Sequence, residues 1–354
     1  MAHLERETLP LEALYTLLHQ HAWNATAYQI VNPGIRHWFS PDGDAVIGYV
    51  TRAGVRVVAG APVCDEAQLA YTLAAFAREA QQSGESVCYF GAAGRVFSLL
   101  SELPRHSVVV LGAQPVWNPQ HLPAWRPSLR AQLSRARNKG VVVREWPVTK
   151  AASHPELARV LAEWLARKPL PSMHFLVEPQ TLAVLTDKRI FVAEREGSPV
   201  GFVTLAPIPA RSGWLTEQFV RGGNAPNGTV ELMLDTALRA VALDGAQYLT
   251  MGLVPLSSGT WDPTLYNPLW LRFSLGWVRA HGQRFYNFGG LEAFKAKFSP
   301  SEWEPIYAIA NEPHFSPRTL WAIADAFSDR SPLSMVTRGL LKAARQEWRW
   351  LRHR

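Results

Sequence analysis

The sequence has few cysteines, and their positions form no metal-binding or disulfide pattern. Cys64 and Cys88 each lie inside an apolar run that reads as core or strand. Two isolated thiols without ligand spacing exclude a disulfide scaffold and a cysteine-based metal site. We therefore expect both thiols to be reduced, as in a cytosolic protein.

Long apolar runs are also missing. No stretch of 18 apolar residues occurs, so the sequence does not predict a helix that spans a bilayer. The first 25 residues contain Glu5, Glu7 and Glu12 and no continuous apolar region, which argues against a signal peptide. We expect a cytoplasmic chain that can still lie, as a peripheral protein, on the inner face of the cytoplasmic membrane.

The composition is typical of a folded protein with a basic surface. Of the 354 residues, 47% are apolar and 14 are tryptophan, which is enough to bury sizeable cores. The length exceeds that of a usual single domain, so we expect two domains. A formal net charge of +7 favours anionic partners such as nucleic acid, phosphate-bearing ligands or an anionic membrane face.

The first half of the chain alternates strand and helix signals. Asp65 is a candidate N-cap for a helix in which Leu69, Leu73 and Phe76 recur at helical spacing, and Gly84 ends the pattern. The predicted elements are, in order, a hairpin over 45–63, this helix, a strand over 86–91, a short helix near 96–101, a strand over 107–112 and a helix over 128–140.

The second half repeats this alternation. The predicted elements are a helix over 154–167, a hairpin over 189–207, a strand over 213–220, a helix over 229–245, and strands over 246–253 and 304–310, with further helices between the last two. This order is typical of the acetyltransferase superfamily, in which a helix after the central strand faces the acyl donor. Two such units in tandem are the simplest architecture.

The loop before the predicted helix at 229–245 indicates which class of acyl donor the protein uses. Acetyl-CoA enzymes of that superfamily have a turn Arg/Gln-x-x-Gly-x-Gly/Ala there, because bare backbone N–H groups must approach a pyrophosphate. Here the loop reads RGGNAPNGT from Arg221, so that Asn224 and Pro226 stand where glycine is needed. Proline supplies no N–H. The loop therefore argues against an ordinary coenzyme A cradle.

Five segments resemble a known family. They are ARNKG, APNGTVELMLD, GLVPLSSG, FYNFGGLEAFKAKF and WEPIY, and the similarity extends in order over residues 25–312. The chain resembles the cytosolic catalytic domain of tRNA-dependent phosphatidylglycerol lysyl- and alanyltransferases, known from multiple peptide resistance factors. The membrane-embedded flippase half of that family has no counterpart in these 354 residues, so the chain resembles a stand-alone form.

The resemblance implies a fold and a reaction. It implies an α/β (α+β) fold of two tandem acetyltransferase-like (GNAT) domains, with mixed sheets flanked by helices. We expect an N-terminal domain at 1–145, a catalytic domain at 146–330 and a basic amphipathic helix at 331–354. The implied reaction moves an aminoacyl group from aminoacyl-tRNA to a hydroxyl acceptor, above all a phospholipid such as phosphatidylglycerol. We find no cofactor or metal motif and expect neither; the amino acid, the acceptor and the oligomeric state stay open.

Two acidic residues are candidates for the general base. Glu231 and Asp235 lie one turn apart beside the apolar face of the predicted helix, and like charges at this spacing repel mildly. They are candidates for a base or for a ligand of the amino acid's ammonium group. A solvated helix flank is the alternative. Asn227, Gly228 and Thr229 supply free N–H groups at the same end, where simple capping is the alternative role.

The segment over 284–300 combines aromatic rings with lysines. On a helix from Leu291, Leu291, Phe294 and Phe298 would form one stripe, flanked by lysines on opposite sides. The lysines could then bind the tRNA 3′ end or a lipid phosphate, and the rings could stack on a base or form a buried strand face. The substrate-binding candidates are Tyr286, Asn287, Phe288, Lys295 and Lys297, with Arg211 and Arg221 as weaker ones.

Two further basic elements are candidate docking surfaces. A helix carrying Arg130, Arg135, Arg137 and Lys139 could rest on the phosphates of the tRNA acceptor stem, or could be a solvated face. The C-terminal tail has apolar residues at 3, 4, 3 spacing beside a basic stripe, which is typical of a helix on an anionic membrane. A helix packed on its own domain or touching nucleic acid is the alternative. The membrane-binding candidates are Lys342, Arg345, Trp348, Arg349, Leu351 and Arg352.

Two other functions remain open on the sequence alone. A non-catalytic module that binds tRNA or anionic lipid would bind without turnover and would tolerate the loss of Glu231 or Asp235. A coenzyme A-dependent N-acyltransferase would be stabilised by acetyl-CoA despite its missing glycines.

Overall fold

The computed structural model describes residues 2–168, 173–257 and 288–328. The elements that come mainly from the first half are α1 (Ala2–His21), η1 (Ala27–Val31), β1 (Arg36–Phe39), β2 (Val46–Arg52), β3 (Val55–Ala59), α2 (Leu69–Gln82), β4 (Ser86–Ala92), α3 (Gly94–Leu100), β5 (Ser107–Trp117) and α4 (Pro127–Asn138). The remaining elements are β6 (Val141–Trp146), α5 (Val148–Ala152), α6 (Pro155–Arg167), β7 (Arg189–Arg195), β8 (Ser198–Ile208), η5 (Pro209–Arg211), β9 (Gly213–Arg221), α7 (Thr229–Leu243), β10 (Tyr248–Thr250), β11 (Val254–Pro255), α9 (Phe288–Ala296), β12 (Glu302–Ala310) and α10 (Pro317–Phe327).

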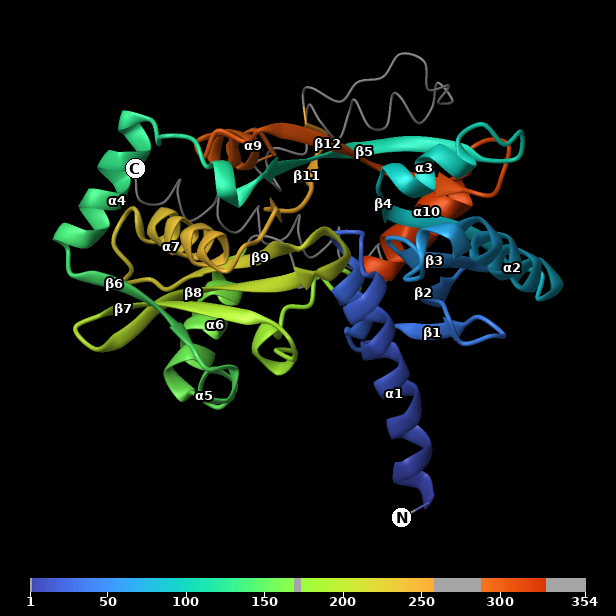
Figure 1. The fold of residues 1–354 in the computed structure, drawn as a ribbon, viewed down its shortest axis with the longest axis horizontal. Helices are drawn as coiled ribbons and strands as arrows, with labels where there is room; N and C mark the ends of the chain where they lie inside the picture. The colour runs from blue at the N-terminus through green and yellow to red at the C-terminus, as the bar shows by residue number, and fades with distance from the viewer. Residues whose placement is uncertain (1, 169–172, 258–287, 329–354) are drawn as a thin grey trace, which may run out of the picture.

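The described strands form one mixed sheet, which helices flank (Figure 1). Its order is β1-β2-β3-β4-β12-β5-β10-β9-β8-β7-β6, and β11 pairs with β5. All neighbours are antiparallel except two pairs, β3 with β4 and β9 with β10. Each parallel pair is joined by a crossover helix, α2 in one half and α7 in the other. The predicted mixed α/β class is confirmed.

The helix, cap and turn signals of the sequence predicted several elements correctly. The side chains of Leu69, Leu73 and Phe76 are buried on α2, and Gly84 ends the pattern with a left-handed φ of +68°. Asp65 accepts a hydrogen bond from the backbone N–H of Ala67, which caps the 3-10 turn that leads into the helix. The two predicted hairpins are β2–β3 and β7–β8.

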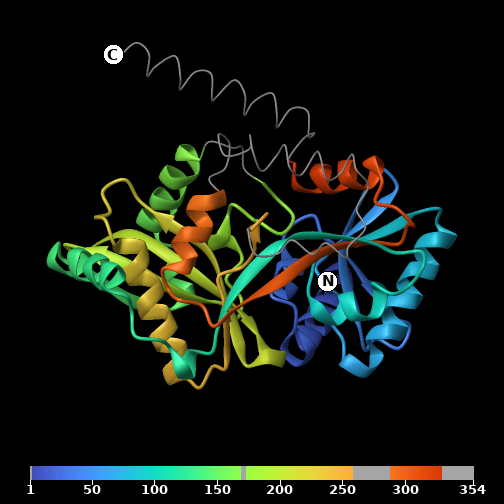
Figure 2. The same ribbon diagram turned by 90° about the horizontal axis from the view of Figure 1, so that it is seen from above.

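Strand β12 differs from its predicted place. It was expected to complete the second half, but it lies between β4 and β5. Figure 2 shows β12 and β5 crossing the molecule side by side. The physical reason is that residues 306–310 are all buried, so the strand needs a partner on each edge and cover on each face. The domain boundaries at 145 and 330 stay a prediction.

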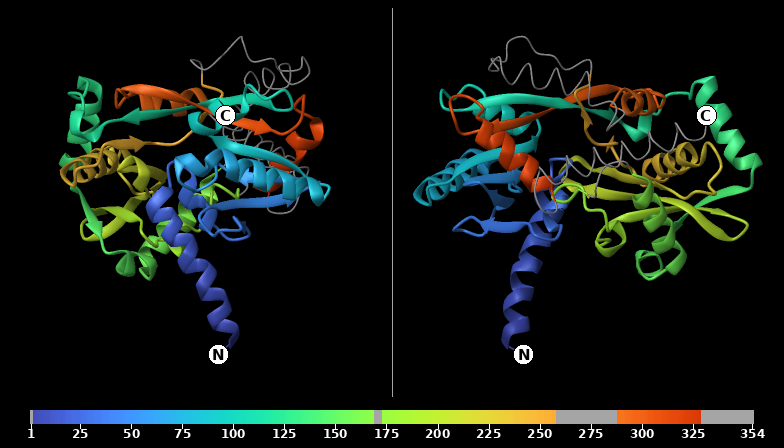
Figure 3. Two further views of the ribbon diagram at one scale, coloured as in Figure 1. Left: turned by 45° about the vertical axis from the view of Figure 1, so that its right-hand side comes forward. Right: turned by 180° about the vertical axis from the view of Figure 1, so that it is seen from behind.

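The core lies on both faces of this sheet. One cluster packs α7 and α4 against β7–β9 through residues such as Leu133, Met233 and Leu238. Another packs α2 and α3 against β2–β4, with Phe76 and Val96 among its members. Helix α1 projects from the body, so that only its C-terminal part lies near the sheet (Figure 3). That part leads into η1, at the junction of the two halves.

Candidate functional site

A β-bulge interrupts β9 just beyond its pairing with β10. Val203 pairs with Phe219 and Leu205 pairs with Thr216, so Thr204 alone faces the two residues Glu217 and Gln218. The parallel pairing of β10 with β9 ends at Leu215. Among the described strands, none pairs with β9 on that side from Thr216 onward. Bulges re-aim side chains beside active sites, and ligands of α/β folds bind at the carboxyl ends of parallel strands.

Glu217 lies at the centre of a buried polar network. Its carboxylate accepts hydrogen bonds from Lys188 Nζ at 2.8 and 3.0 Å. Thr204 Oγ1 donates to it at 2.8 Å, and Gln29 Nε2 donates at 2.9 Å. Because Gln29 belongs to η1 and the other residues belong to the second half, the bulge joins the two halves. The sequence analysis missed this network, although the adjacent glutamate and glutamine at 217 and 218, inside a predicted strand, were a signal.

Gln218, the second bulge residue, contacts a lysine and a backbone carbonyl. Its side-chain oxygen accepts from Lys168 Nζ at 3.3 Å, and its Nε2 donates to the carbonyl oxygen of Glu178 at 2.5 Å. Lys168 Nζ also lies 3.6 Å from the centre of the Trp164 ring. Burial lowers the pKa of Lys168 to about 8. His174 Nδ1 lies 3.6 Å from the carboxylate of Glu178.

Lys295 is buried close to the end of β10. Only 3% of the residue is exposed, and its Nζ donates to the carbonyl oxygens of Met251, Gly252 and Leu253 at 2.6 to 3.2 Å. Burial lowers the pKa of Lys295 to about 7. The predicted outward-facing phosphate ligand therefore points inward, where it holds the backbone that leaves β10.

Two of the predicted site residues, Glu231 and Lys297, are in contact. Glu231 lies in the first turn of α7, and its carboxylate is 3.5 Å from Lys297 Nζ. The Lys297 side chain is 41% exposed, so its ammonium group is open to an anionic ligand. The prediction of one helix that carries the stripe Leu291, Phe294 and Phe298 with a lysine on each flank is wrong in its extent, because α9 ends at Ala296, before Lys297 and Phe298.

Asp235 serves as an anchor for three donors. It is 2% exposed, and its carboxylate accepts from Trp125 Nε1 at 2.6 Å, Arg239 Nε at 2.8 Å and Arg137 Nη2 at 3.3 Å. A carboxylate occupied in this way is poorly placed to take a proton from a substrate. These contacts favour a structural role for Asp235 and Arg137.

The loop before α7 is braced by its own residues and by α4. Arg221 Nη2 donates to the carbonyl oxygen of Ala225 at 2.8 Å and to Asn227 Oδ1 at 3.0 Å. Thr229 Oγ1 donates to the carbonyl oxygen of Pro226. Gly228 has a φ of +91°, and a Cβ at this position would lie 2.1 Å from the Gln132 carbonyl oxygen of α4. The helix α4 thus packs closely against the loop that leads into α7.

Arg211 is held in an ion pair at the junction of the halves. It donates to both oxygens of Glu304, at 2.6 and 3.1 Å. Gln114 and Tyr248 donate to the same carboxylate. Burial raises the pKa of Glu304, but the hydrogen bonds from Arg211 and Gln114 outweigh it and hold that pKa below its usual value. The Arg211 guanidinium also lies 4.7 Å from the centre of the Trp23 ring.

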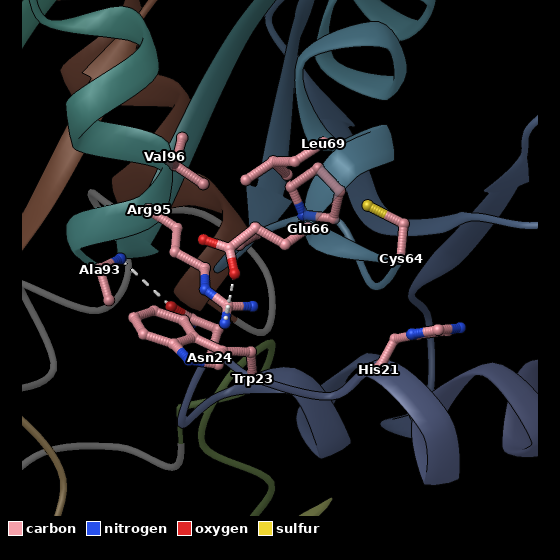
Figure 4. Close-up of a pocket in the computed structure, with 11 residues that line it drawn as sticks. His21, Trp23, Asn24, Cys64, Glu66, Leu69, Ala93, Arg95 and Val96 are labelled. Atoms are coloured by element: carbon pink, nitrogen blue, oxygen red, sulfur yellow. Dashed lines mark hydrogen bonds and ion pairs between the residues drawn. The ribbon is translucent and has the colours of Figure 1, made fainter. Parts of the chain in front are cut away.

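Trp23 lines a pocket at the carboxyl ends of β3 and β4 (Figure 4). Arg95 lies between Glu66, at 2.9 Å, and the Trp23 ring, whose centre is 4.3 Å from the guanidinium carbon. His21 and Cys64 line the same pocket. The ring therefore links a guanidinium from each half, and the pocket forms the first-half side of the junction.

The other predicted residues divide into exposed ones and ones outside the described ranges. Arg130, Arg135 and Lys139 are exposed on or directly after α4. Phe288 begins α9. The candidates Tyr286, Asn287, Lys342, Arg345, Trp348, Arg349, Leu351 and Arg352 lie outside the described residues.

Within the described ranges, no group of three or more His, Cys, Asp or Glu side chains is placed to hold a metal ion. None of the helices in the same part of the chain is both long and apolar enough to cross a membrane.

Comparison with known proteins identifies the family. The family model described as "Phosphatidylglycerol lysyltransferase, C-terminal" matches residues 15–310. The phosphatidylglycerol lysyltransferase of Bacillus subtilis is 24% identical over 306 residues, which cover 84% of this chain and 34% of that protein. The chain thus spans about a third of the length of this relative.

Two solved structures share the fold. A C-terminal domain from Agrobacterium fabrum, assigned to lysylphosphatidylglycerol synthetase, has a TM-score of 0.75 at 21% identity and covers 90% of this chain and 96% of that one. L-PGS from Bacillus licheniformis has a TM-score of 0.71 at 21% identity and covers 94% of this chain and 96% of that one. With the family model matching residues 15–310 of 354, the chain belongs to the family of phosphatidylglycerol lysyltransferase C-terminal domains.

Proposed function

We propose that this chain transfers an aminoacyl group from aminoacyl-tRNA to the hydroxyl group of an anionic phospholipid such as phosphatidylglycerol. The observation that carries the proposal is the family match over residues 15–310. The geometry is compatible with it, since buried polar groups from both halves meet at the bulge of β9.

The reaction needs little from the protein beyond orientation and one base. An aminoacyl ester is already activated, and aligning it with a hydroxyl group can contribute roughly 7–11 kcal/mol of the barrier. A base removes the hydroxyl proton while the hydroxyl oxygen bonds to the carbonyl carbon of the aminoacyl ester. The bond between that carbon and the 3′ oxygen of the tRNA then breaks, and the 3′ oxygen keeps the electron pair and takes up a proton. Neither step requires a metal ion or a cofactor.

Glu231 is our candidate for the base. Its only hydrogen bond among the described contacts is the long one to Lys297, which leaves oxygen lone pairs for a substrate hydroxyl. Asp235 is the weaker candidate, because its carboxylate already accepts three hydrogen bonds. Lys297 is positioned beside the base and half-exposed, so we assign it to a phosphate of the lipid or of the tRNA 3′ end.

The exposed basic face of α4 is our candidate for tRNA binding. Arg130, Arg135 and Lys139 are exposed, so they can contact phosphates without giving up buried contacts. Attachment to the inner membrane face through residues 331–354, with a cytoplasmic location, stays part of the proposal.

The test is transfer of label into lipid. The purified chain is incubated with tRNA charged with a mixture of radiolabelled amino acids and with vesicles that contain phosphatidylglycerol, and the lipids are extracted. We expect label in the organic phase, and we expect Glu231→Gln to lower the initial rate at least about 100-fold, as removal of a general base does. Glu196→Gln, in the exposed turn of the β7–β8 hairpin, is the matched control and should keep the full rate.

Three outcomes would count against the proposal. Label that stays on tRNA while the protein binds it would favour the non-catalytic module. Release of free amino acid alone would exclude a lipid acceptor. Stabilisation of the protein by acetyl-CoA of more than a few degrees would favour the coenzyme A-dependent N-acyltransferase, against which Pro226 in the loop before α7 argues.

A further inference from the structure

The pocket beside Trp23 has no part in the proposed transfer reaction. It lies at the carboxyl ends of the parallel strands β3 and β4, where ligands of α/β folds bind (Figure 4). The loop after β3 supplies Ala61, Pro62 and Cys64, and Ala93 and Arg95 follow β4. The crossover connection and the start of α3 therefore enclose the space between them.

Asn24 fixes the backbone around this pocket. It is 4% exposed, its Oδ1 accepts a hydrogen bond from the Ala93 N–H at 3.1 Å, and its Nδ2 donates to the carbonyl oxygen of Gly91 at 3.0 Å. Gly60, after β3, lies so close that a Cβ there would be 2.5 Å from Asn24 Nδ2. The ends of both strands are thus held in place before any ligand binds, which lowers the entropy cost of binding.

Two opposite charges line the pocket and contact each other. Arg95 Nη2 lies 2.9 Å from the carboxylate of Glu66, and the guanidinium carbon lies 4.3 Å from the centre of the Trp23 ring. The side chains of Arg95 and Glu66 are 28% and 66% exposed, so the ion pair is weak and can separate. The guanidinium therefore occupies a place where a carboxylate and an indole ring together stabilise a cation.

This pair distinguishes between classes of ligand. A simple anion would bind Arg95 but would leave Glu66 as an unpaired like charge beside it. A simple cation would take the place of the guanidinium and leave Arg95 without its partner. A zwitterion satisfies both side chains, because its ammonium group can replace the guanidinium at Glu66 and Trp23 while its carboxylate binds the displaced Arg95.

The size of the cavity limits what else the ligand carries. Its volume is about 20 Å³, room for one water molecule or one methyl group. Ala61, Leu69 and Val96 are among the residues that line it, so part of its wall is apolar. We propose that this pocket binds a small free amino acid, with alanine as the best fit, at a site separate from the proposed transfer site. The proposal does not depend on the transfer reaction.

The experiment is equilibrium dialysis of the full chain against radiolabelled L-alanine, without tRNA or lipid. We expect saturable binding of one alanine per chain. Unlabelled alanine should compete, whereas acetate and ethylamine, which each carry one of the two charges, should compete at least about tenfold less well. L-phenylalanine should also compete at least about tenfold less well, because its side chain overfills the cavity. Absence of saturable binding, or equal competition by any of these three compounds, would overturn the proposal.

Variants then locate the bound alanine. Arg95→Gln and Glu66→Gln should each weaken binding at least about tenfold, because each removes one charged partner. Arg78→Gln and Glu102→Gln make the same charge changes at exposed positions and should leave binding unchanged. Binding that persists at full strength in both pocket variants, with folding confirmed by circular dichroism, would place the alanine elsewhere and contradict the proposal. The lipid transfer assay is run separately, so failure of the proposed function would leave this binding result unaffected.

Discussion

Replacement of Asp235 separates a structural role from a catalytic one. In Asp235→Ala the buried Trp125 Nε1–H loses its acceptor, and a buried donor left unpaired costs about 1–3 kcal/mol. Arg137 and Arg239 also lose their partner, but their side chains are 56% and 60% exposed, so solvent screening limits each loss to below about 1 kcal/mol. We expect the free energy of unfolding to fall by about 2–4 kcal/mol in total.

The assay measures stability and rate on the same preparations. Urea unfolding, followed by tryptophan fluorescence, gives the free energy of unfolding for the wild type, Asp235→Ala and Asp235→Asn. The asparagine variant keeps one acceptor oxygen and should be intermediate. Asp244→Ala is the matched control: its carboxylate binds Arg189 but the side chain is 60% exposed, and we expect a loss below about 1 kcal/mol.

Transfer rates then decide the role. At a temperature where the variants are folded, we expect Asp235→Ala to keep a transfer rate within about tenfold of the wild type, since positioning effects of this kind are smaller than loss of a base. Unchanged unfolding free energy together with a rate more than about 100-fold lower would refute the structural role and restore Asp235 as a catalytic residue.

Three further predictions follow from single contacts. Gly228→Ala should lower the free energy of unfolding by more than about 1 kcal/mol through strain and collision with α4, while Gly245→Ala, which also has positive φ but open space, should cost less in urea unfolding. Burial lowers the pKa of Lys295 from its ordinary 10.5 to about 7, so the unfolded chain binds more protons between these values and stability should rise with pH there. Lys168, whose pKa is lowered to about 8, contributes to the same rise, so Lys295→Met should reduce the rise and should remove the part of it between about pH 7 and 8. Replacing Arg130 and Arg135 with alanine should reduce the slope of log K for tRNA against log salt by about 1 to 2, measured by filter binding, and an unchanged slope would exclude this face.

The buried lysine illustrates where periodicity misled. The pattern of Leu291, Phe294 and Phe298 predicted an exposed Lys295, because a short apolar stripe was assumed to be the whole packed face. The structure instead buries Lys295 against carbonyls of residues 251–253, more than 40 positions earlier in the chain. A nine-residue helix has too few turns for its own sequence to show which sides are covered.

The bulge was missed for a related reason. Glu217 and Gln218 stand out as adjacent polar residues in the predicted strand, but the bulge that they form is visible only when the register with β8 is known. Their partners Gln29, Lys188 and Lys168 come from distant segments, and nothing in the local composition connects them.

The sequence by itself determined the local elements of the fold and showed the resemblance to the family. The turns, the helix pattern of α2, the hairpins and the loop with Pro226 all depend on residues close together in the chain, so their patterns could be read directly. The mixed α/β class followed from their order.

Only the tertiary structure decided which side chains meet. It placed β12 between β4 and β5, joined Glu231 to Lys297, occupied Asp235 with three donors and formed the polar network at the β9 bulge. These contacts depend on long-range packing and on strand register, where a shift of one residue turns a side chain to the other face of the sheet. Chemistry at this site is therefore set by neighbours that are close in space but far apart in the sequence.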